Sequence, residues 1–342
     1  MKFFMAIDVS CAGILVVDFI AADLPKISDP GELTFTPVEM HIGGHAANVS
    51  IDLVKLGLKG GVSSIGAVGY DLLGDFIEQT LRSYGVAAHL IRTREARTSM
   101  DLILVVRGED RRFHFDIGAN LHLDPGRVEA IIKDERPLIF YGGAVGLLGG
   151  FDEALPEVLK LAKGMGSLTL VDPIKPYGKG WGFLWEATPY IDVFHCNNLE
   201  AAEMTGESDV ENAVQALMRR GIKLPIISTG GGGIIAGYGD AMYYMPTFKV
   251  EAVDPTGAGD AFCSGIIRML IGLKGERLRR GLELDEEELI KVLAYGQAAG
   301  AVCVTAVGTT TAVEESRVDE LLKRQGDSVT SKVRKVRALP SS

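Results

Sequence analysis

Short apolar runs alternate along this chain with segments in which apolar residues recur every three or four positions. The clearest runs cover residues 12–17, 138–141, 168–171, 191–194 and 226–228. Runs of this length suit strands covered on both faces, so they predict a mostly parallel central sheet. The helical patterns at 46–56 and 209–220 each end before a glycine, a common helix stop. This alternation predicts an α/β domain with helices on both faces of the sheet.

Two segments interrupt this alternation. Residues 98–106 and 111–117 flank a hairpin-like turn, and residues 19–42 are extended and contain three prolines. We interpret them as a small β-sheet lid, formed from about 19–42 and 95–118, although a plain surface excursion explains the pattern nearly as well. One domain is expected over 1–325. The basic stretch at 326–342 is expected to be a frayed tail.

Composition and charge exclude several classes of protein. The 342 residues include 35 basic and 45 acidic side chains, a net charge of −10, which argues against nucleic-acid binding. Asp8 and Asp18 interrupt the apolar N-terminal stretch, so no piece reaches the roughly 18 residues of a membrane span. Four scattered cysteines, none paired in a CxxC motif, are typical of a reduced protein. We therefore expect a cytoplasmic protein with no membrane partner.

The segment 251–267 carries the sharpest candidate for chemistry. Its glycine-rich turn, Gly257-Ala258-Gly259, leads into Asp260 and an apolar helix. Backbone N–H groups at such a helix start can hold phosphoryl oxygens. Asp260 would then stand beside the transferred group and accept a proton as general base. A helix-capping role for Asp260 is about equally compatible with this segment alone.

Three further turns could contact ligands. Gly43-Gly44 precedes a helix in which Asn48 can bind a polyol, although by itself Asn48 is better explained as part of the wet face of the helix. Asn197 and Glu200 follow a predicted strand, where ligands of α/β sheets bind, and can order Mg²⁺ or simply start a helix. Thr229 opens a run of four glycines that suits either a nucleotide phosphate or a hairpin turn.

Several common enzyme motifs are absent from the sequence. It contains no GxxxxGK[ST] loop, no HRD or DFG motif, and no GxSxG elbow. Its six histidines form no HxxxH or HExxH pattern. The sequence therefore gives no support to a P-loop NTPase, a protein kinase, a serine hydrolase or a histidine-based metal site.

Taken together, these segments resemble the ribokinase-like (PfkB) carbohydrate kinase family over roughly residues 5–315. GGHAANVSIDLVKLG resembles its N-terminal signature and DPTGAGDAFCSGI its more specific C-terminal signature. Weaker pieces occur in family order, including GAN at 118–120 and NNLEAAEMTG at 197–206. The resemblance implies a Rossmann-like α/β domain with a β-sheet lid, which is often a dimer clasp.

The resemblance also implies an activity and a set of site residues. It implies transfer of the γ-phosphoryl group of ATP to a hydroxymethyl oxygen, with Mg²⁺ and a monovalent cation, usually K⁺. Asp260 matches the base and the amides of Gly257, Ala258 and Gly259 match the anion hole. Asp18, Gly43, Gly44 and Asn48 match the sugar contacts, and Asn197, Thr229 and Gly231 match nucleotide contacts. Glu200 matches the residue tied to Mg²⁺, and Asp254 and Thr256 match backbone-carbonyl ligands of the monovalent cation.

The acceptor is less well defined. Ribokinases usually have GGKGAN and fructokinases GGAPAN at the first signature, whereas this chain has His45 at the variable position. The missing lysine favours an unphosphorylated sugar or polyol, although lid residues near Arg112 and His114 could still supply a cation. A nucleoside kinase, a phosphosugar kinase and a non-catalytic sugar or nucleotide sensor remain as alternatives.

Overall fold

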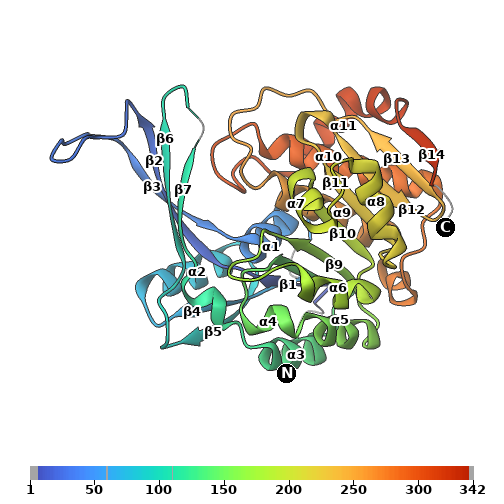
Figure 1. Cartoon of the computed structure of the whole chain (residues 1–342), viewed down its shortest axis with the longest axis horizontal. Coiled ribbons are helices and arrows are strands. Elements are labelled where there is room, and N and C mark those ends of the chain that lie inside the picture. The colour runs from blue at the N-terminus through green and yellow to red at the C-terminus, as the bar shows by residue number, and fades with distance from the viewer. Residues whose placement is uncertain (1–6, 59–60, 110, 339–342) are drawn as a thin grey trace.

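The computed structural model describes residues 7–58, 61–109 and 111–338, which form a large sheet, a small sheet and flanking helices (Figure 1). In this part of the chain the large sheet has ten strands in the order β14-β13-β12-β11-β10-β9-β8-β1-β4-β5. Its strands are β1 (Val9–Gly13), β4 (Val62–Gly69), β5 (Ala87–Thr93), β8 (Ile139–Val145), β9 (Leu168–Pro173), β10 (Val193–Asn197), β11 (Leu224–Ser228), β12 (Ile234–Tyr238), β13 (Ala241–Met245) and β14 (Arg334–Arg337). The pairings from β5 through β11 are parallel, and those from β11 to β14 are antiparallel.

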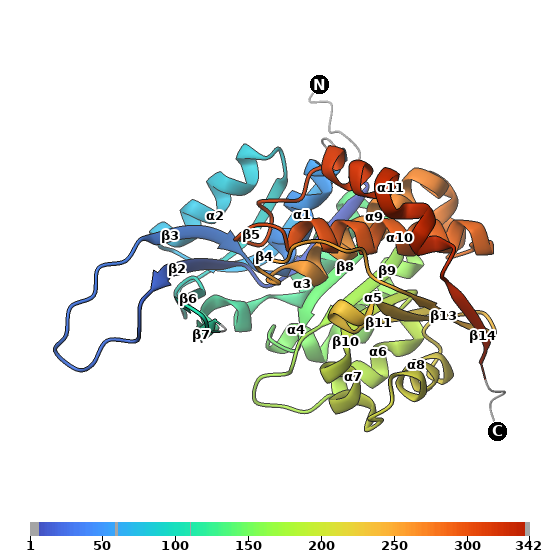
Figure 2. The ribbon, with the colours of Figure 1, turned by 90° about the horizontal axis from the view of Figure 1, so that it is seen from above.

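Helices cover both faces of this sheet (Figure 2). They are α1 (His45–Lys55), α2 (Leu72–Ser83), α3 (Pro125–Glu135), α4 (Gly150–Glu153), α5 (Leu155–Gly164), α6 (Gly182–Ala187), α7 (Asn198–Thr205), α8 (Val210–Arg219), α9 (Ala258–Lys274), α10 (Glu286–Cys303) and α11 (Glu315–Thr330). Successive strand residues alternate between two cores, so Tyr141 packs with α9 and α10 while Phe140 packs with α3 and α5. The predicted α/β class, with a mostly parallel sheet and helices on both faces, is confirmed.

The small sheet is the predicted lid. It has the order β3-β2-β6-β7, with β2 (Val16–Leu24), β3 (Val38–Gly43), β6 (Met100–Val106) and β7 (Arg112–Asp116). Strands β6 and β7 form the expected antiparallel hairpin, and β2 pairs with β6 in parallel. Several apolar lid residues are exposed, among them Phe113, Phe115 and Met40.

Two predictions about where secondary-structure elements begin and end are wrong. The run at 12–17 is not one core strand, because β1 ends at Gly13 and the chain enters lid strand β2 at Val16, so Asp18 belongs to the lid. The Asn120 side chain bonds the backbone N–H and C=O of Leu15 at 3.0 and 3.2 Å, which fixes this transition. Nor is the stretch from 326 frayed, because α11 continues to Thr330 and β14 pairs with β13. Residues 339–342 lie outside the described residues.

No helix in the described ranges combines the length and the apolar character needed to cross a membrane.

Candidate active site

Helix α9 starts at a glycine instead of a capping side chain. Gly257 has a φ of 78°, and a Cβ atom there would lie 2.7 Å from the carbonyl oxygen of Thr309, so this close approach favours glycine. The N–H of Ala258 donates to the Pro255 carbonyl at 3.3 Å, whereas those of Gly257 and Gly259 form no hydrogen bond within the described residues. The start of α9 therefore keeps N–H groups that can bind an anion.

Asp260 is the third residue of α9 and reaches across the molecule instead of capping its own helix. Its Oδ2 accepts a 2.8 Å hydrogen bond from the side-chain amide of Asn48, whose Oδ1 accepts one of 2.8 Å from the Thr309 hydroxyl. The other oxygen, Oδ1, is buried without a hydrogen-bond partner among the described residues, and Nε2 of His45 lies 3.9 Å away. The capping interpretation is wrong, because Gly257 holds the cap position. One carboxylate oxygen is thus held in place while the other is left for a ligand.

The surroundings of Asp260 favour a proton acceptor. Burial raises the pKa of its carboxyl above the ordinary range, and Asp172 raises it further, while His45 and the Asn48 hydrogen bond act against this. Asn48 itself is buried, so the wet-face interpretation of this residue is also wrong. A carboxylate with a raised pKa is a better proton acceptor than an exposed one.

A cavity of about 160 Å³ lies between the lid and the loop that precedes α9. The lining residues are Asp18, Ile20, His41, Ile103, Val105, Glu109, Arg111, Val253, Asp254, Pro255, Thr256, Val307, Gly308 and Thr309. Asp18 is in register with Asp101 on the next lid strand. A side chain at Gly43 would overlap the Asp18 carboxylate, and one at Gly44, with a φ of 92°, would meet the carbonyl of Ile14. The two glycines therefore let the start of α1 lie against the lid.

Asp18 gives this cavity a pH dependence that can be measured. Burial, then Asp101 and Asp260, raise the pKa of Asp18 to about 7. If the Asp18 carboxylate binds acceptor hydroxyls, protonation below this pKa weakens that binding. Because a single titration near 7 removes the carboxylate, we expect the acceptor Kd, measured calorimetrically without nucleotide, to rise about tenfold from pH 8 to pH 6. The Asp18→Asn variant should show a flat profile; equal wild-type affinities at both pH values would contradict this role.

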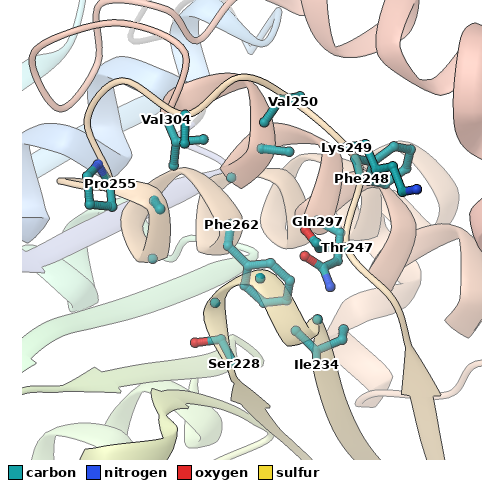
Figure 3. A pocket seen from close by; sticks show the side chains of 18 of the residues that line it. Ser228, Ile234, Thr247, Phe248, Lys249, Val250, Pro255, Phe262, Gln297 and Val304 are labelled. Atoms are coloured by element: carbon teal, nitrogen blue, oxygen red, sulfur yellow. The ribbon is translucent and has the colours of Figure 1, made fainter.

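A larger cavity, of about 460 Å³, opens on the other side of the same loop (Figure 3). Ile234, Phe248, Val250, Phe262 and Val304 give it apolar walls. The shape and the apolar lining suit a nucleobase and ribose.

The polar groups of this larger cavity include an unpartnered amide and a glycine loop. Nε2 of Gln297 is buried with no partner among the described residues. Gly231 lines the cavity, as expected, whereas Thr229 closes the glycine loop by donating its hydroxyl to the carbonyl of Gly233 at 3.0 Å. Thr229 therefore shapes the loop and is not among the lining residues.

Asn197 and Glu200 form a capping box at the start of α7. The Asn197 side chain accepts hydrogen bonds of 2.9 Å from the N–H groups of Leu199 and Glu200, and Oε2 of Glu200 accepts one of 3.0 Å from the N–H of Asn197. The helix-start alternative is therefore correct for the local structure. Burial raises the pKa of Glu200, and Asp172 adds to this against the Asn197 hydrogen bond. Its second carboxylate oxygen lies outside the capping box, so a hydrated Mg²⁺ fits beside it.

Asp254 and Thr256 lie close together, and Arg111 pairs with the Asp254 carboxylate. The Asp254 carboxylate accepts hydrogen bonds from the N–H groups of Thr256 at 2.7 Å and Gly308 at 3.2 Å, and it pairs with the guanidinium of Arg111. The Cys303 thiol lies 3.2 Å from the carbonyl oxygen of Thr309 and 3.5 Å from that of Thr256. A monovalent cation thus fits this loop less well than the family resemblance implies. Arg111 lines the 160 Å³ cavity, whereas neither Arg112 nor His114 is among its described lining residues.

The sequence reasoning missed several residues of this site. His45 and Asp172 bring ligand atoms within 4.8 Å of one another and of the predicted Asp260, and His195 lines the larger cavity. Asp172 lies near the end of β9, where ligands of α/β sheets bind, and this position is a signal that could have found it. His195 lies in the middle of the neighbouring strand β10 and has no such signal. No local sequence pattern points to Arg111 as a site residue.

The site consists of the uncapped start of α9, the buried carboxylate of Asp260 and two cavities that flank the loop leading into this helix. The family model for the pfkB family carbohydrate kinases matches residues 6–316, and the chain belongs to this family. It is therefore a carbohydrate kinase, which transfers a phosphoryl group to an alcohol acceptor.

Individual relatives are distant but cover nearly the whole chain. Fructokinase-1 of Zea mays is 28% identical over an alignment of 297 residues, and the match covers 82% of this chain and 88% of the maize chain. The structure of ribokinase from Giardia lamblia matches with a TM-score of 0.81 at 20% identity, over 94% of this chain and 99% of that chain. An E. coli protein assigned as ribokinase II, in complex with ATP and Mg²⁺, matches with a TM-score of 0.74 at 21% identity, over 93% and 99%.

Proposed function

We propose that this kinase transfers the γ-phosphoryl group of ATP to the hydroxymethyl group of an unphosphorylated sugar or related polyol. The observation that carries the proposal is the position of Asp260. Its unpartnered Oδ1 lies at the uncapped start of α9, and the two cavities flank the loop that leads into this helix. A base there can take the acceptor proton while the helix start holds the transferred group.

The mechanism assigns each element of the site a separate task. Asp18, Gly43, Gly44 and Asn48 orient the acceptor, and Asp260 receives its hydroxyl proton as the oxygen attacks the γ-phosphorus. The N–H groups of Gly257 and Gly259 stabilise the charge that develops on the transferred group, and that of Ala258 joins them when it leaves the Pro255 carbonyl. Asn197, Thr229 and Gly231 shape the nucleotide side. Mg²⁺, when bound beside Glu200, neutralises phosphate charge.

The acceptor cavity itself supports an unphosphorylated substrate. Asp18, Glu109 and Asp254 contribute three carboxyl groups to its lining, and its one guanidinium, that of Arg111, is paired with Asp254. A phosphate dianion would meet net negative charge there. No phenylalanine, tyrosine or tryptophan appears among the described lining residues, which disfavours a nucleoside base as the acceptor group.

A panel of acceptors tests the substrate class. Coupled ADP release from MgATP would be measured with pentoses, hexoses, polyols, sugar phosphates and nucleosides. We expect one unphosphorylated sugar or polyol to give the highest kcat/KM. A sugar phosphate or a nucleoside as the best substrate would replace the proposed acceptor class.

The ion pair between Arg111 and Asp254 leads us to expect only a small effect of a monovalent cation on kcat. Because its guanidinium already supplies positive charge beside Asp254, replacing K⁺ by a bulky organic cation should change kcat by less than about twofold. The Arg111→Ala variant leaves Asp254 as a mostly buried, uncompensated carboxylate, so it should lose about 3 kcal/mol of stability and gain activation by K⁺. Denaturant unfolding and rates with and without K⁺ measure both effects. A wild-type enzyme that is inactive without K⁺ would contradict this and support carbonyl coordination at Asp254 and Thr256.

The proposal includes a homodimer formed through the lid. Exposed Phe113 and Phe115 lie in register with Ile103 and Asp101, while exposed Met40 pairs with Phe19, so apolar side chains face solvent on both faces of the sheet. A second copy of the lid could cover them. Light scattering should give twice the chain mass; a monomer at micromolar concentration would reject this part.

The proposed unit of activity is a single kinase domain that includes the lid and, beyond the expected boundary at 325, the end of α11 and strand β14. Its four cysteines are free and buried, and ATP is its phosphoryl donor, so we place the protein in the cytoplasm.

A further inference from the structure

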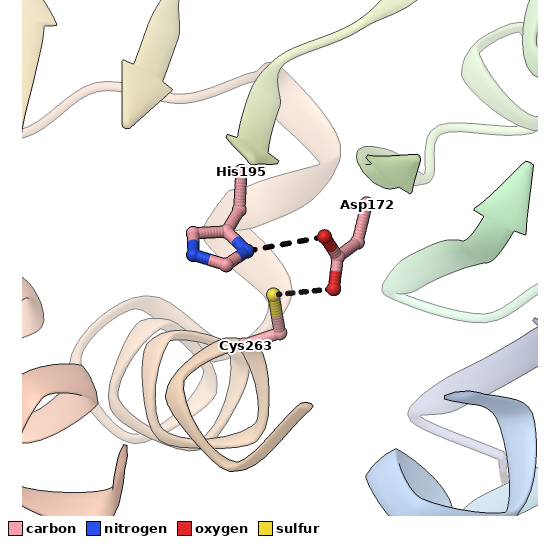
Figure 4. A group of neighbouring side chains, drawn as sticks. All are labelled: Asp172, His195 and Cys263. Carbon is pink, nitrogen blue, oxygen red and sulfur yellow. Dashed lines mark hydrogen bonds and ion pairs between the residues drawn. The ribbon is translucent and has the colours of Figure 1, made fainter. Parts of the chain in front are cut away.

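Asp172 is the hub of a buried cluster beneath the phosphoryl-transfer site (Figure 4). It lies near the end of β9, and its Oδ1 is 3.1 Å from Nδ1 of His195 on β10. Its Oδ2 accepts from the Cys263 thiol at 3.6 Å and from the Tyr141 hydroxyl at 3.3 Å. Every one of these contacts converges on the carboxylate, which therefore fixes how the imidazole is oriented.

The second nitrogen of His195 is left without a partner. Nε2 is buried and makes no hydrogen bond within the described residues. The side chain lines the 460 Å³ cavity, and its ring lies 4.9 Å from that of Phe262. A Cβ atom on Gly259 would lie 3.3 Å from Cε1 and 4.0 Å from Nδ1 of His195, and Cε1 is the ring atom between Nδ1 and Nε2. The imidazole edge is therefore next to the glycine turn at the start of α9.

We propose that Nε2–H of His195 donates a hydrogen bond to a phosphate oxygen of the bound nucleotide, with Asp172 as its positioning residue. This rests on the proposed use of the larger cavity for ATP. The imidazole is thus a side-chain donor in addition to the backbone N–H groups at the start of α9. It lies on the side of the glycine turn opposite the acceptor cavity. A buried donor without a hydrogen-bond partner is energetically unfavourable. A ligand oxygen that accepts this hydrogen bond would remove the cost and explain why the donor stands at a cavity wall.

The charges around His195 favour the donor form. Burial lowers the pKa of the imidazole, but Asp172, Glu200 and Asp260 outweigh this, so its pKa lies above the ordinary value. Burial likewise acts to raise the pKa of Asp172, but His195, His45 and the Cys263 thiol outweigh it, so that carboxyl stays ionised. With Nδ1–H directed to Asp172, a protonated ring presents Nε2–H to the cavity. A bound phosphate would further favour the protonated form of the ring.

A buried metal explains the cluster less well. Asp172, His195 and Cys263 offer ligand atoms within 4.8 Å of one another, but their contacts with one another already satisfy those atoms. Burial raises the pKa of the Cys263 thiol well above its ordinary value, with Asp172 adding to it, which disfavours the thiolate a metal would need. The unsatisfied atom is Nε2 of His195, a residue that lines the cavity.

Two substitutions at His195 separate donation from packing. His195→Phe keeps a ring but removes the donor, and His195→Gln places an uncharged N–H donor near the position of Nε2. Cys263→Ala is the matched control, because it removes another neighbour of Asp172 without altering a residue that lines the cavity. Each variant would be titrated calorimetrically with MgATP, MgADP and adenosine, in the absence of acceptor.

We expect His195→Phe to weaken MgATP binding by about 10- to 100-fold, the range for a lost hydrogen bond to a charged group, while adenosine binding is unchanged. His195→Gln should recover a large part of the loss, and Cys263→Ala should bind like the wild type. Wild-type MgATP affinity in His195→Phe, or an equal loss for adenosine, would overturn the proposal. These titrations contain no acceptor, so an error in the proposed sugar substrate would leave their outcome unaffected.

Discussion

The Asp260→Asn variant is expected to lose about 10²- to 10⁴-fold in kcat, the usual contribution of a general base. Its amide oxygen can still accept the hydrogen bond from Asn48, so the side chain should stay in place. The change removes the ability to take the acceptor proton and little else. MgATP and acceptor affinities should therefore remain close to those of the wild type, and the loss should appear in kcat at saturating concentrations of both.

Asp52 provides a matched control for this variant. It is also buried, its carboxylate oxygens have no hydrogen-bond partner in the described structure, and burial raises its pKa well above the ordinary value. Burial thus favours the neutral form of this carboxyl, and Asp52→Asn replaces it with a neutral group of the same shape. This variant should retain kcat within about twofold. Turnover near the wild-type level in Asp260→Asn would remove Asp260 as the base.

The second large effect is expected from Gly257→Ala. Alanine would have to adopt the left-handed conformation at a φ of 78°, and its Cβ would meet the backbone of Thr309 at 2.7 Å. The turn must shift, and the N–H groups at residues 257–259 move with it. Loss of an oxyanion donor typically costs about 10²- to 10³-fold in kcat, and we expect a loss in that range.

Gly164→Ala is the control for this substitution. Gly164 ends α5, and no atom lies within 4 Å of a Cβ built there, so the variant should keep full activity. Thermal unfolding of Gly257→Ala distinguishes a shifted turn from an unfolded protein, because the strain predicts only about 1–2 kcal/mol of lost stability. A folded Gly257→Ala enzyme with wild-type kcat would show that the amides do not stabilise the transferred group.

The sequence was sufficient to predict elements whose signal is local. The helices at 46–56 and 209–220 and the core strands other than the run at 12–17 have continuous or periodic apolar patterns, and the structure places a helix or strand at each. The transition at Leu15 was not predictable, because the amide that fixes it comes from Asn120, 105 positions away. Strand β14 was missed because it is short, exposed and at the sheet edge, where Arg334 stacks on Tyr244 instead of entering the core.

The residues of the candidate site also fall into two groups, those with a local sequence signal and those without one. Asp260 and the glycine turn were predicted because they are contiguous in a specific motif. Arg111 and His195 were not, because each acquires its partner only through the fold: Arg111 meets Asp254 from the lid, and His195 meets Asp172 from a neighbouring strand. A histidine in an apolar strand is indistinguishable in sequence from an ordinary core residue.

The central claim is phosphoryl transfer to the hydroxymethyl oxygen of a sugar or polyol, with Asp260 as base. Phosphorus-31 NMR of the reaction with MgATP and the best acceptor tests it most directly. The account predicts one phosphomonoester on a primary carbon for every ADP formed by the wild type, and none above background with Asp260→Asn. ATP consumption without a phosphomonoester, or binding of both ligands without any turnover across the panel, would contradict it and favour a non-catalytic sensor or a wasteful ATPase.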